Sequence, residues 1–276
     1  MKEGKGMKKF TAFVATAVLS ISFFSTNANA QNVADPTAAL QDQNTMSVLW
    51  FQKAGEAKAL YYQGYNVGKM RLNEILKKKP KKKALKPAVV LDIDETILDN
   101  SPYQAWNVVS GKAYPLNWNE WINSAQAKPL PGAIDFLKYA NAKGVEIYYI
   151  SNRTEVQKDA TIKNLKSVGA PQADAAHVLL KQPGEKGKEI RRQQVAKTHN
   201  IVLLFGDNLG DFSGFDDLSV SERLQAVDKH RYEFGKKLIV FPNPMYGDWE
   251  GAIYNYDFSK SDVEKAKLRK DNLVPY

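Results

Sequence analysis

Five short apolar runs mark the chain between residues 87 and 241, and longer amphipathic or polar stretches separate them. Each run is rich in β-branched and aliphatic residues without an apolar–polar alternation, which is typical of strands buried on both faces of a parallel sheet. The runs comprise residues 89–91, 145–150, 177–180, 201–205 and 237–241. Helices are predicted between them, at 131–142, 155–168, 185–197 and within 215–235. This alternation predicts an α/β fold with a doubly wound parallel sheet and right-handed crossovers.

The segment ahead of the first strand, residues 31–86, is predicted to be a helical accessory element that ends in a lysine-rich linker. A helical stripe of apolar positions runs over residues 48–76, although glycines inside it are expected to weaken or break the helix. Residues 32–45 are polar and show no period, so we expect a flexible start there.

Length and composition allow one substantial core, because the chain has 276 residues of which 43% are hydrophobic. We expect that core to span residues 87–260, with an aromatic, cap-like stretch at 103–128, and a helical tail over 261–276. The net charge of +9 owes much to the lysines between residues 77 and 86. A nucleic acid could bind such a run, but aromatic residues do not interleave with it. A solvated linker is therefore preferred, and no stable nucleic-acid partner is expected.

Residues 1–30 carry the features of a secretory signal peptide. Lys8 and Lys9 precede an apolar stretch from Phe10 to Phe24, and residues 27–30 provide the small residues of a cleavage site. A membrane anchor is the alternative, which the shortness of the stretch disfavours. We therefore expect an exported protein with no transmembrane segment after cleavage, either secreted or retained in the cell envelope. Because the chain has no cysteine, disulfides and lipidation through cysteine are excluded.

Acidic residues follow two of the predicted strands. Asp92 and Asp94 come directly after residues 89–91, and Asp207 and Asp211 come after residues 201–205. Because parallel strands bind ligands at their carboxyl ends, these carboxylates are expected to meet. Carboxylates this close repel one another unless a cation or a shared proton stabilises them, and oxygen ligands suit magnesium. For the first pair alone, an Asx turn at the end of a strand is an equal alternative.

Hydrogen-bond donors follow the second predicted strand. Ser151, Asn152 and Arg153 succeed residues 145–150 there. For Arg153, a surface ion pair and a contact with phosphate are equally compatible with the sequence. Lys188 lies near the start of a predicted helix, whose amino end favours phosphate.

The order of these motifs, with Asp-x-Asp first, then Ser, Lys and a final Asp pair, resembles that of the haloacid dehalogenase (HAD) superfamily. Residues 89–103 and 206–212 more closely resemble the two signatures of the class C acid phosphatases, the DDDD phosphatases of the bacterial envelope. This resemblance implies the strand order 5-4-1-2-3 and a small cap. The chain departs from the lipoproteins of that family, because it lacks their cysteine after the leader.

The resemblance implies a Mg²⁺-dependent acid phosphatase with Asp92 as the nucleophile and Asp94 as the general acid and base. It places Mg²⁺ on the Asp92 side chain, the Asp94 backbone carbonyl and Asp207, with Asp211 as a weaker ligand or a partner of metal-bound water. Ser151, Asn152 and Lys188 are expected to bind the phosphoryl group. Lys181 and Lys186 stay open as alternatives to Lys188.

Two aromatic residues are candidates for the substrate site. Trp118 and Tyr246 are predicted to lie on loops, where exposed aromatic side chains often bind ligands. The resemblance implies that they stack on a base, so that the small-molecule substrates include nucleoside 5′-monophosphates. A phosphotransferase and a non-catalytic envelope protein that binds nucleotides or surfaces are the alternative functions, and a homodimer is left open.

Overall fold

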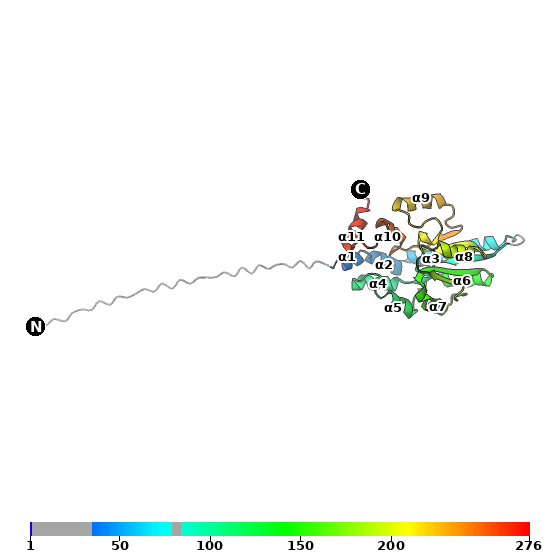
Figure 1. Ribbon diagram of the computed structural model, residues 1–276, viewed down its shortest axis with the longest axis horizontal. Coiled ribbons are helices and arrows are strands. Elements are labelled where there is room, and N and C mark those ends of the chain that lie inside the picture. The colour runs from blue at the N-terminus through cyan, green and yellow to red at the C-terminus, as the bar shows by residue number, and fades with distance from the viewer. Residues whose placement is uncertain (2–34, 79–83) are drawn as a thin grey trace. The chain divides into compact units, whose positions relative to one another are not determined.

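The computed structural model describes Met1, residues 35–78 and residues 84–276 (Figure 1). The predicted signal peptide and most of the lysine run therefore lie outside the described residues. Within the described ranges, no helix has the length and apolar character needed to cross a membrane.

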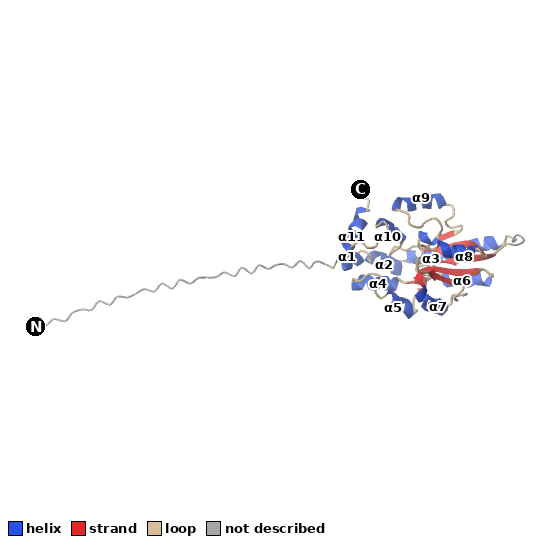
Figure 2. Ribbon diagram, in the orientation of Figure 1, coloured by secondary structure: helices blue, strands red, loops and turns tan. Residues whose placement is uncertain are grey.

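A five-stranded parallel sheet forms the centre of the protein (Figure 2). Its strands are β1 (Lys86–Leu91), β4 (Glu146–Thr154), β5 (Val178–Lys181), β6 (His199–Gly206) and β7 (Leu238–Val240). They are ordered β5-β4-β1-β6-β7, and all neighbouring pairs are parallel. Numbered 1 to 5 along the chain and read from the β7 edge, these strands have the order 5-4-1-2-3, so the predicted topology is confirmed. The main difference is that β4 continues to Thr154, past its predicted end at residue 150.

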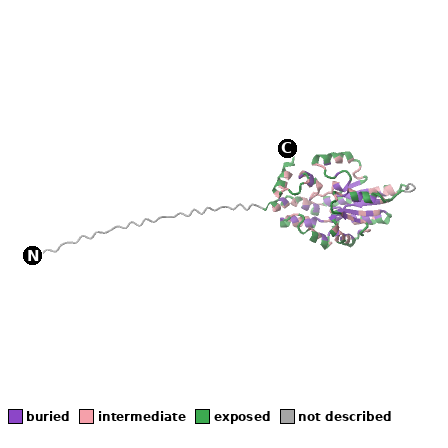
Figure 3. Cartoon of the chain, in the orientation of Figure 1, coloured by how far each residue is buried: buried purple, intermediate pink, exposed green. Residues whose placement is uncertain are grey.

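Both faces of the sheet are buried, which explains the apolar runs without alternation (Figure 3). Successive residues of β1 point to opposite faces. Val89 and Leu91 belong to the core under helices α3 (Gly55–Leu76) and α6 (Ala133–Ala142). Ala88 and Val90 belong to a smaller core on the other face, where α8 (Glu189–Ala196) packs.

The other predicted helices of the core are present. The segment predicted at 155–168 forms a 3₁₀ turn, η1 (Glu155–Gln157), followed by α7 (Lys158–Ser167). The stretch within 215–235 contains α9 (Val220–His230). Helix α6 begins two residues later than predicted because Gly132, with φ of +82°, directly precedes it.

The expectation of a flexible start was wrong for the described residues from 36 onwards. Helix α1 (Pro36–Asp42) begins with Asp35 as its cap, whose Oδ1 accepts from the Thr37 N–H at 2.9 Å. Helix α2 (Thr45–Lys53) follows at once. Only Leu40 of α1 is buried, so a short helix of this kind leaves almost no apolar period in the sequence.

The glycines of the accessory segment mark close packing more than breaks. Gly55 begins α3 after a break at Ala54, but Gly64 and Gly68 lie inside that helix. A Cβ at Gly68 would lie 2.6 Å from the ring of Phe205 in β6. The missing side chains therefore let α3 approach the aromatic residues of the sheet closely.

The aromatic stretch at 103–128 forms a small cap of two helices, α4 (Ser101–Ser110) and α5 (Trp118–Ser124). The antiparallel pair β2 (Leu98–Asp99) and β3 (Lys128–Pro129) connects the two ends of this segment. The chain finishes with α10 (Asp248–Ile253) and α11 (Asp262–Asp271). Helix α11 packs against α1, and Thr37 Oγ1 donates to Asp262 Oδ2 at 2.5 Å. The predicted division into accessory segment, core and tail stays a prediction.

Candidate active site

Three carboxylates meet where β1 and β6 end. Oxygen atoms of Asp92, Asp207 and Asp211 all lie within 4.8 Å of one another. Asp92 and Asp211 are buried, each with 6% of its surface exposed. The two strands are neighbours in the sheet, and the expectation that the carboxylates at their ends would meet is confirmed for these three but not for the side chain of Asp94.

Short polar contacts fix the two later carboxylates. Asp211 ends the 3₁₀ turn η2 (Leu209–Asp211), and its Oδ2 accepts from the Asn208 N–H at 2.9 Å. Asp207 Oδ2 accepts from Asn243 Nδ2 at 2.8 Å, and its Oδ1 accepts from Thr96 Oγ1 at 3.4 Å. Three loops, after β1, β6 and β7, thus supply the carboxylate cluster and its supports.

Lys188 is the lysine that lies in the cluster. Its Nζ donates to Asp92 Oδ1 and, at 2.5 Å, to Asp211 Oδ1. It occupies the position directly before α8 and is buried, whereas Lys186 is exposed and Lys181 lies half-buried at the end of β5. The geometry therefore favours Lys188 among the three candidates.

The cluster carries more negative charge than Lys188 can neutralise. Burial raises the pKa of Asp92 to about 7, against the opposing effect of Lys188. Burial, together with Asp211 and Asp92, also raises the pKa of Asp207 well above its usual value. Burial alone would lower the pKa of Lys188, but Asp211 and Asp92 outweigh it and raise that pKa. Three carboxylates surround one ammonium, and their oxygens are ligand atoms of the kind that a hard divalent cation prefers. The residues of the cluster therefore fit such a cation.

Asp94 lies outside this cluster of side chains and has its own partners. Arg153 donates to Asp94 Oδ1 from Nη2 at 2.7 Å and from Nε at 3.0 Å. Asn100 Nδ2 donates to the same oxygen at 2.7 Å, and Ser151 Oγ donates to Oδ2 at 3.1 Å. Burial would raise the pKa of Asp94, but Arg153 and Asn100 outweigh it and hold that pKa below its usual value. That its backbone carbonyl binds the metal stays a prediction.

Ser151 and Asn152, which are predicted to bind phosphate, lie in different environments. Ser151 is fully buried, and besides donating to Asp94 its Oγ accepts from the Arg153 N–H at 3.1 Å. Asn152 is exposed, and its Oδ1 accepts from Arg191 Nη2 at 2.8 Å. Arg191 also donates to the Gly187 carbonyl at 2.7 Å, so it ties the end of β4 to the loop that precedes Lys188.

Several supporting contacts around the site were not predicted from the sequence. Arg153 is 3% exposed, so its pairing with Asp94 is buried and the surface alternative was wrong. Glu95 is fully buried at φ of +52°, and its carboxylate accepts from the Asn100 N–H at 2.7 Å. Tyr61 and Tyr65 of α3 donate to the carbonyls of Glu95 and Thr96. The four-residue spacing of these tyrosines on one helix face is the signal that could have found them.

Of the two aromatic candidates, Tyr246 lies on a loop as predicted, but Trp118 is the first residue of α5, so its loop prediction was wrong. The Trp118 ring packs edge-on against Tyr103, with 5.0 Å between ring centroids. The Tyr246 hydroxyl donates to Glu95 and so reaches the turn that carries Asp94. Stacking of either ring on a substrate stays a prediction.

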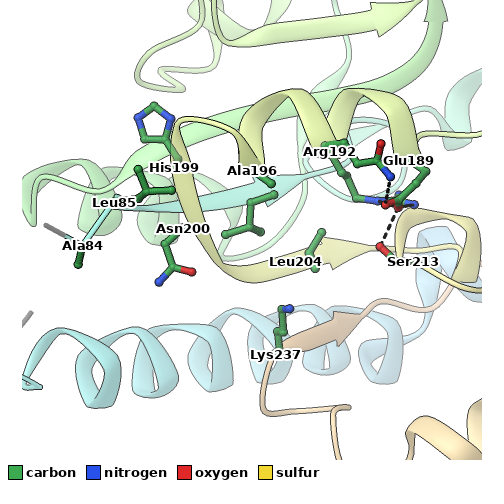
Figure 4. Close-up of a pocket in the computed structure, with 12 residues that line it drawn as sticks. Ala84, Leu85, Glu189, Arg192, Ala196, His199, Asn200, Leu204, Ser213 and Lys237 are labelled. Carbon is green, nitrogen blue, oxygen red and sulfur yellow. Dashed lines mark hydrogen bonds and ion pairs between the residues drawn. The ribbon is translucent and has the colours of Figure 1, made fainter. Parts of the chain in front are cut away.

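A hollow of about 520 Å³ lies at a different place, beside α8 and the starts of β6 and β7 (Figure 4). His199, Asn200 and Lys237 line it, and all three stand at or just before the amino ends of these strands. Ligands of parallel sheets bind at the carboxyl ends, where Asp92 and Asp207 lie. The candidate site is therefore the carboxylate cluster.

The sheet has the HAD strand order, and an aspartate pair directly follows its central strand. A lysine and two more aspartates lie at the same end of the sheet. Together these elements define a HAD-type fold and site. The class follows from these elements together, since each occurs alone in other folds. The chain belongs to the HAD superfamily, subfamily IIIB (Acid phosphatase), whose family model matches residues 6–249.

Known relatives agree with this assignment. The class C acid phosphatase from Bacillus anthracis is 61% identical, with a TM-score of 0.84 over 86% of this chain and 99% of that chain. A second structure of it has tungstate bound. Vegetative storage protein 1 of Arabidopsis thaliana is 29% identical over 130 residues, and acid phosphatase 1 of Solanum lycopersicum is 24% identical over 165 residues. These matches cover 44% and 57% of this chain, and the chain spans about half the length of these two relatives.

Proposed function

We propose that the protein is a Mg²⁺-dependent acid phosphatase that hydrolyses phosphomonoesters through an aspartyl-phosphate on Asp92. The observation that carries this proposal is the contact of buried Asp92 with Lys188, within 4.8 Å of the oxygens of Asp207 and Asp211. Family membership supports it. The presence of all four aspartates argues against a non-catalytic binding protein.

Phosphoryl transfer requires charge neutralisation around the nucleophile and the phosphate. Bound by Asp92, Asp207, Asp211 and the Asp94 carbonyl, Mg²⁺ would supply positive charge to both. An oxygen of Asp92 attacks phosphorus and the ester P–O bond breaks, while Asp94 gives the leaving oxygen a proton that it takes up from solvent when the negatively charged phosphate binds beside it. Asp94 then takes a proton from water, which attacks the phosphorus and releases phosphate and Asp92. Lys188, Ser151 and Asn152 bind the phosphoryl oxygens.

Chelation is expected to abolish phosphate release from p-nitrophenyl phosphate at pH 5–6, and added Mg²⁺ to restore it. The reason is that the buried carboxylates repel one another and the phosphate once the cation is removed. Activity that persists unchanged after dialysis against EDTA would refute metal dependence. Glycerol in the same assay tests the alternative transferase, which would form glycerol phosphate in place of free phosphate.

We further propose that nucleoside 5′-monophosphates are among the substrates, with the base on Trp118 and Tyr246. Trp118 belongs to the small cap, and the Tyr246 hydroxyl donates a hydrogen bond to Glu95, the residue after Asp94. The two residues therefore come from segments far apart in the sequence, one of which reaches the catalytic turn.

Trp118→Ala is expected to lower kcat/KM for AMP about tenfold to a hundredfold, because base–aromatic stacking is worth roughly 1–3 kcal/mol. Glycerol phosphate has no ring and should lose much less. Trp106→Ala is the matched control, since Trp106 also packs against Tyr103, at 6.0 Å between ring centroids. Equal losses for AMP and glycerol phosphate in Trp118→Ala would assign Trp118 a purely structural role.

Export is proposed on the leader sequence alone. Its charged start, apolar stretch and small residues at 27–30 support cleavage after Ala30. A chain without cysteine would then be secreted or held loosely in the envelope.

A further inference from the structure

Asn100 joins the small cap to the catalytic turn through a single side chain. It is fully buried where β2 gives way to α4. Its Oδ1 accepts from the indole Nε1 of Trp121 at 2.8 Å. Its Nδ2 donates to Asp94 Oδ1 at 2.7 Å and to Glu95 Oε2 at 3.4 Å.

The chemistry of these groups allows only one orientation of the Asn100 amide. An indole N–H can only donate, so the amide oxygen of Asn100 must face Trp121, which leaves Nδ2 to face the oxygens of Asp94 and Glu95. The amide therefore satisfies all of its partners only with Oδ1 toward Trp121 and Nδ2 toward Asp94. If the indole N–H were removed, the buried Oδ1 would lose its donor and the amide would lose the contact that orients it.

Trp121 lies on α5 one turn after Trp118, so it connects the helix of the cap to Asp94. We propose that Trp121 and Asn100 are positioning residues, which hold the Asp94 carboxylate where it can protonate the leaving group. This inference rests on the proposed function, because it takes Asp94 as the general acid. Arg153 and Ser151 hold Asp94 from β4, and Asn100 holds it from the side of the cap.

A positioning role makes a prediction that depends on the leaving group. When the ester P–O bond breaks, an alkoxide leaving group takes its proton from Asp94, whereas p-nitrophenolate is stable enough to depart as the anion. In the step that breaks the ester bond, a displaced Asp94 therefore slows alkyl phosphates selectively. A defect in folding or phosphate binding would slow both kinds of substrate.

Trp121→Phe keeps an aromatic ring and removes the N–H donor. We expect kcat for glycerol phosphate to fall about tenfold, a fraction of the 10²–10⁴-fold that general acid catalysis contributes. The single-turnover rate of p-nitrophenolate release should change less than about twofold, with KM for both substrates nearly unchanged. This rate is the readout because Asp94 also acts as the base in hydrolysis of the intermediate, a step that both substrates share. Trp106→Phe, the same change elsewhere in the cap, should behave as wild type toward both substrates.

A double-mutant cycle tests whether Trp121 acts through Asp94. In an Asp94→Asn background, Trp121→Phe should cause no further loss with glycerol phosphate, because the acid is already absent. Asn100→Ala removes all three side-chain hydrogen bonds of Asn100 and should show the same selectivity as Trp121→Phe, so it serves if that variant does not fold.

The outcomes separate this inference from the proposed function. Wild-type protein that releases no phosphate from either substrate with Mg²⁺ would overturn both. Active wild-type protein with equal losses for the two substrates in Trp121→Phe, or with additive losses in the cycle, would overturn the positioning role alone.

Discussion

Asp92→Asn is expected to remove turnover, on the order of 10³-fold or more in kcat, while phosphate binding largely persists. The amide is a poor nucleophile and cannot form the aspartyl-phosphate, but it has nearly the same shape as the carboxylate. Lys188 and Ser151 stay in place to bind the phosphoryl group. Single-turnover phosphate release and equilibrium binding of inorganic phosphate measure the two effects separately.

Asp207→Asn is the matched control, because Asp207 belongs to the same cluster but is proposed only as a metal ligand. Its loss of activity should be partly rescued by high Mg²⁺, whereas that of Asp92→Asn should not. Wild-type turnover in Asp92→Asn would refute the assignment of Asp92 as the nucleophile, but it would not contradict the proposed metal site.

Lys188→Met should lower kcat/KM for any phosphomonoester about 10²–10³-fold, the scale for losing one preorganised donor to developing charge. The substitution keeps a long, unbranched side chain but leaves Asp92 and Asp211 without the ammonium between them. It also removes a cation that opposes the rise in the pKa of Asp92, so less of that carboxylate is ionised at acid pH.

Lys186→Met controls for the loss of positive charge in the same loop, because Lys186 is exposed and lies two residues away. It should retain nearly wild-type kcat/KM. If Lys186→Met lowered kcat/KM as much as Lys188→Met, the summed positive charge of the loop would bind the phosphate, and the assignment of this role to the single buried Lys188 would be refuted.

The features of the fold and the site that could be predicted are those that a local sequence pattern marks. Apolar runs without alternation predicted all five sheet strands, and Asp92 and Asp207 could be paired because each follows such a run. Lys188 was harder to distinguish from Lys186, because the helix that begins beside it starts four residues later than predicted.

The missing parts depend on contacts between distant residues. The partnership of Arg153 with Asp94 joins β4 to the loop after β1, and only the folded sheet brings them together. The hydrogen bond between Asn100 and Trp121 likewise joins the residue after β2 to helix α5 of the cap, and no local pattern indicates it. Trp118 was predicted to lie on a loop because α5 has only seven residues, too few to show a helical period. Asn117 directly before it, with φ of +58°, is itself outside the helix.

The packing of α1 against α11 constrains when the protein can complete its folding. Thr37 and Asp262 are separated by 225 positions, so their contact forms only after the chain has been made as far as residue 262. A chain that emerges amino end first therefore presents α1 without this partner until the last helix appears. The entropic penalty of closing so long a loop grows only slowly with length, so the delay is set by synthesis more than by chain entropy.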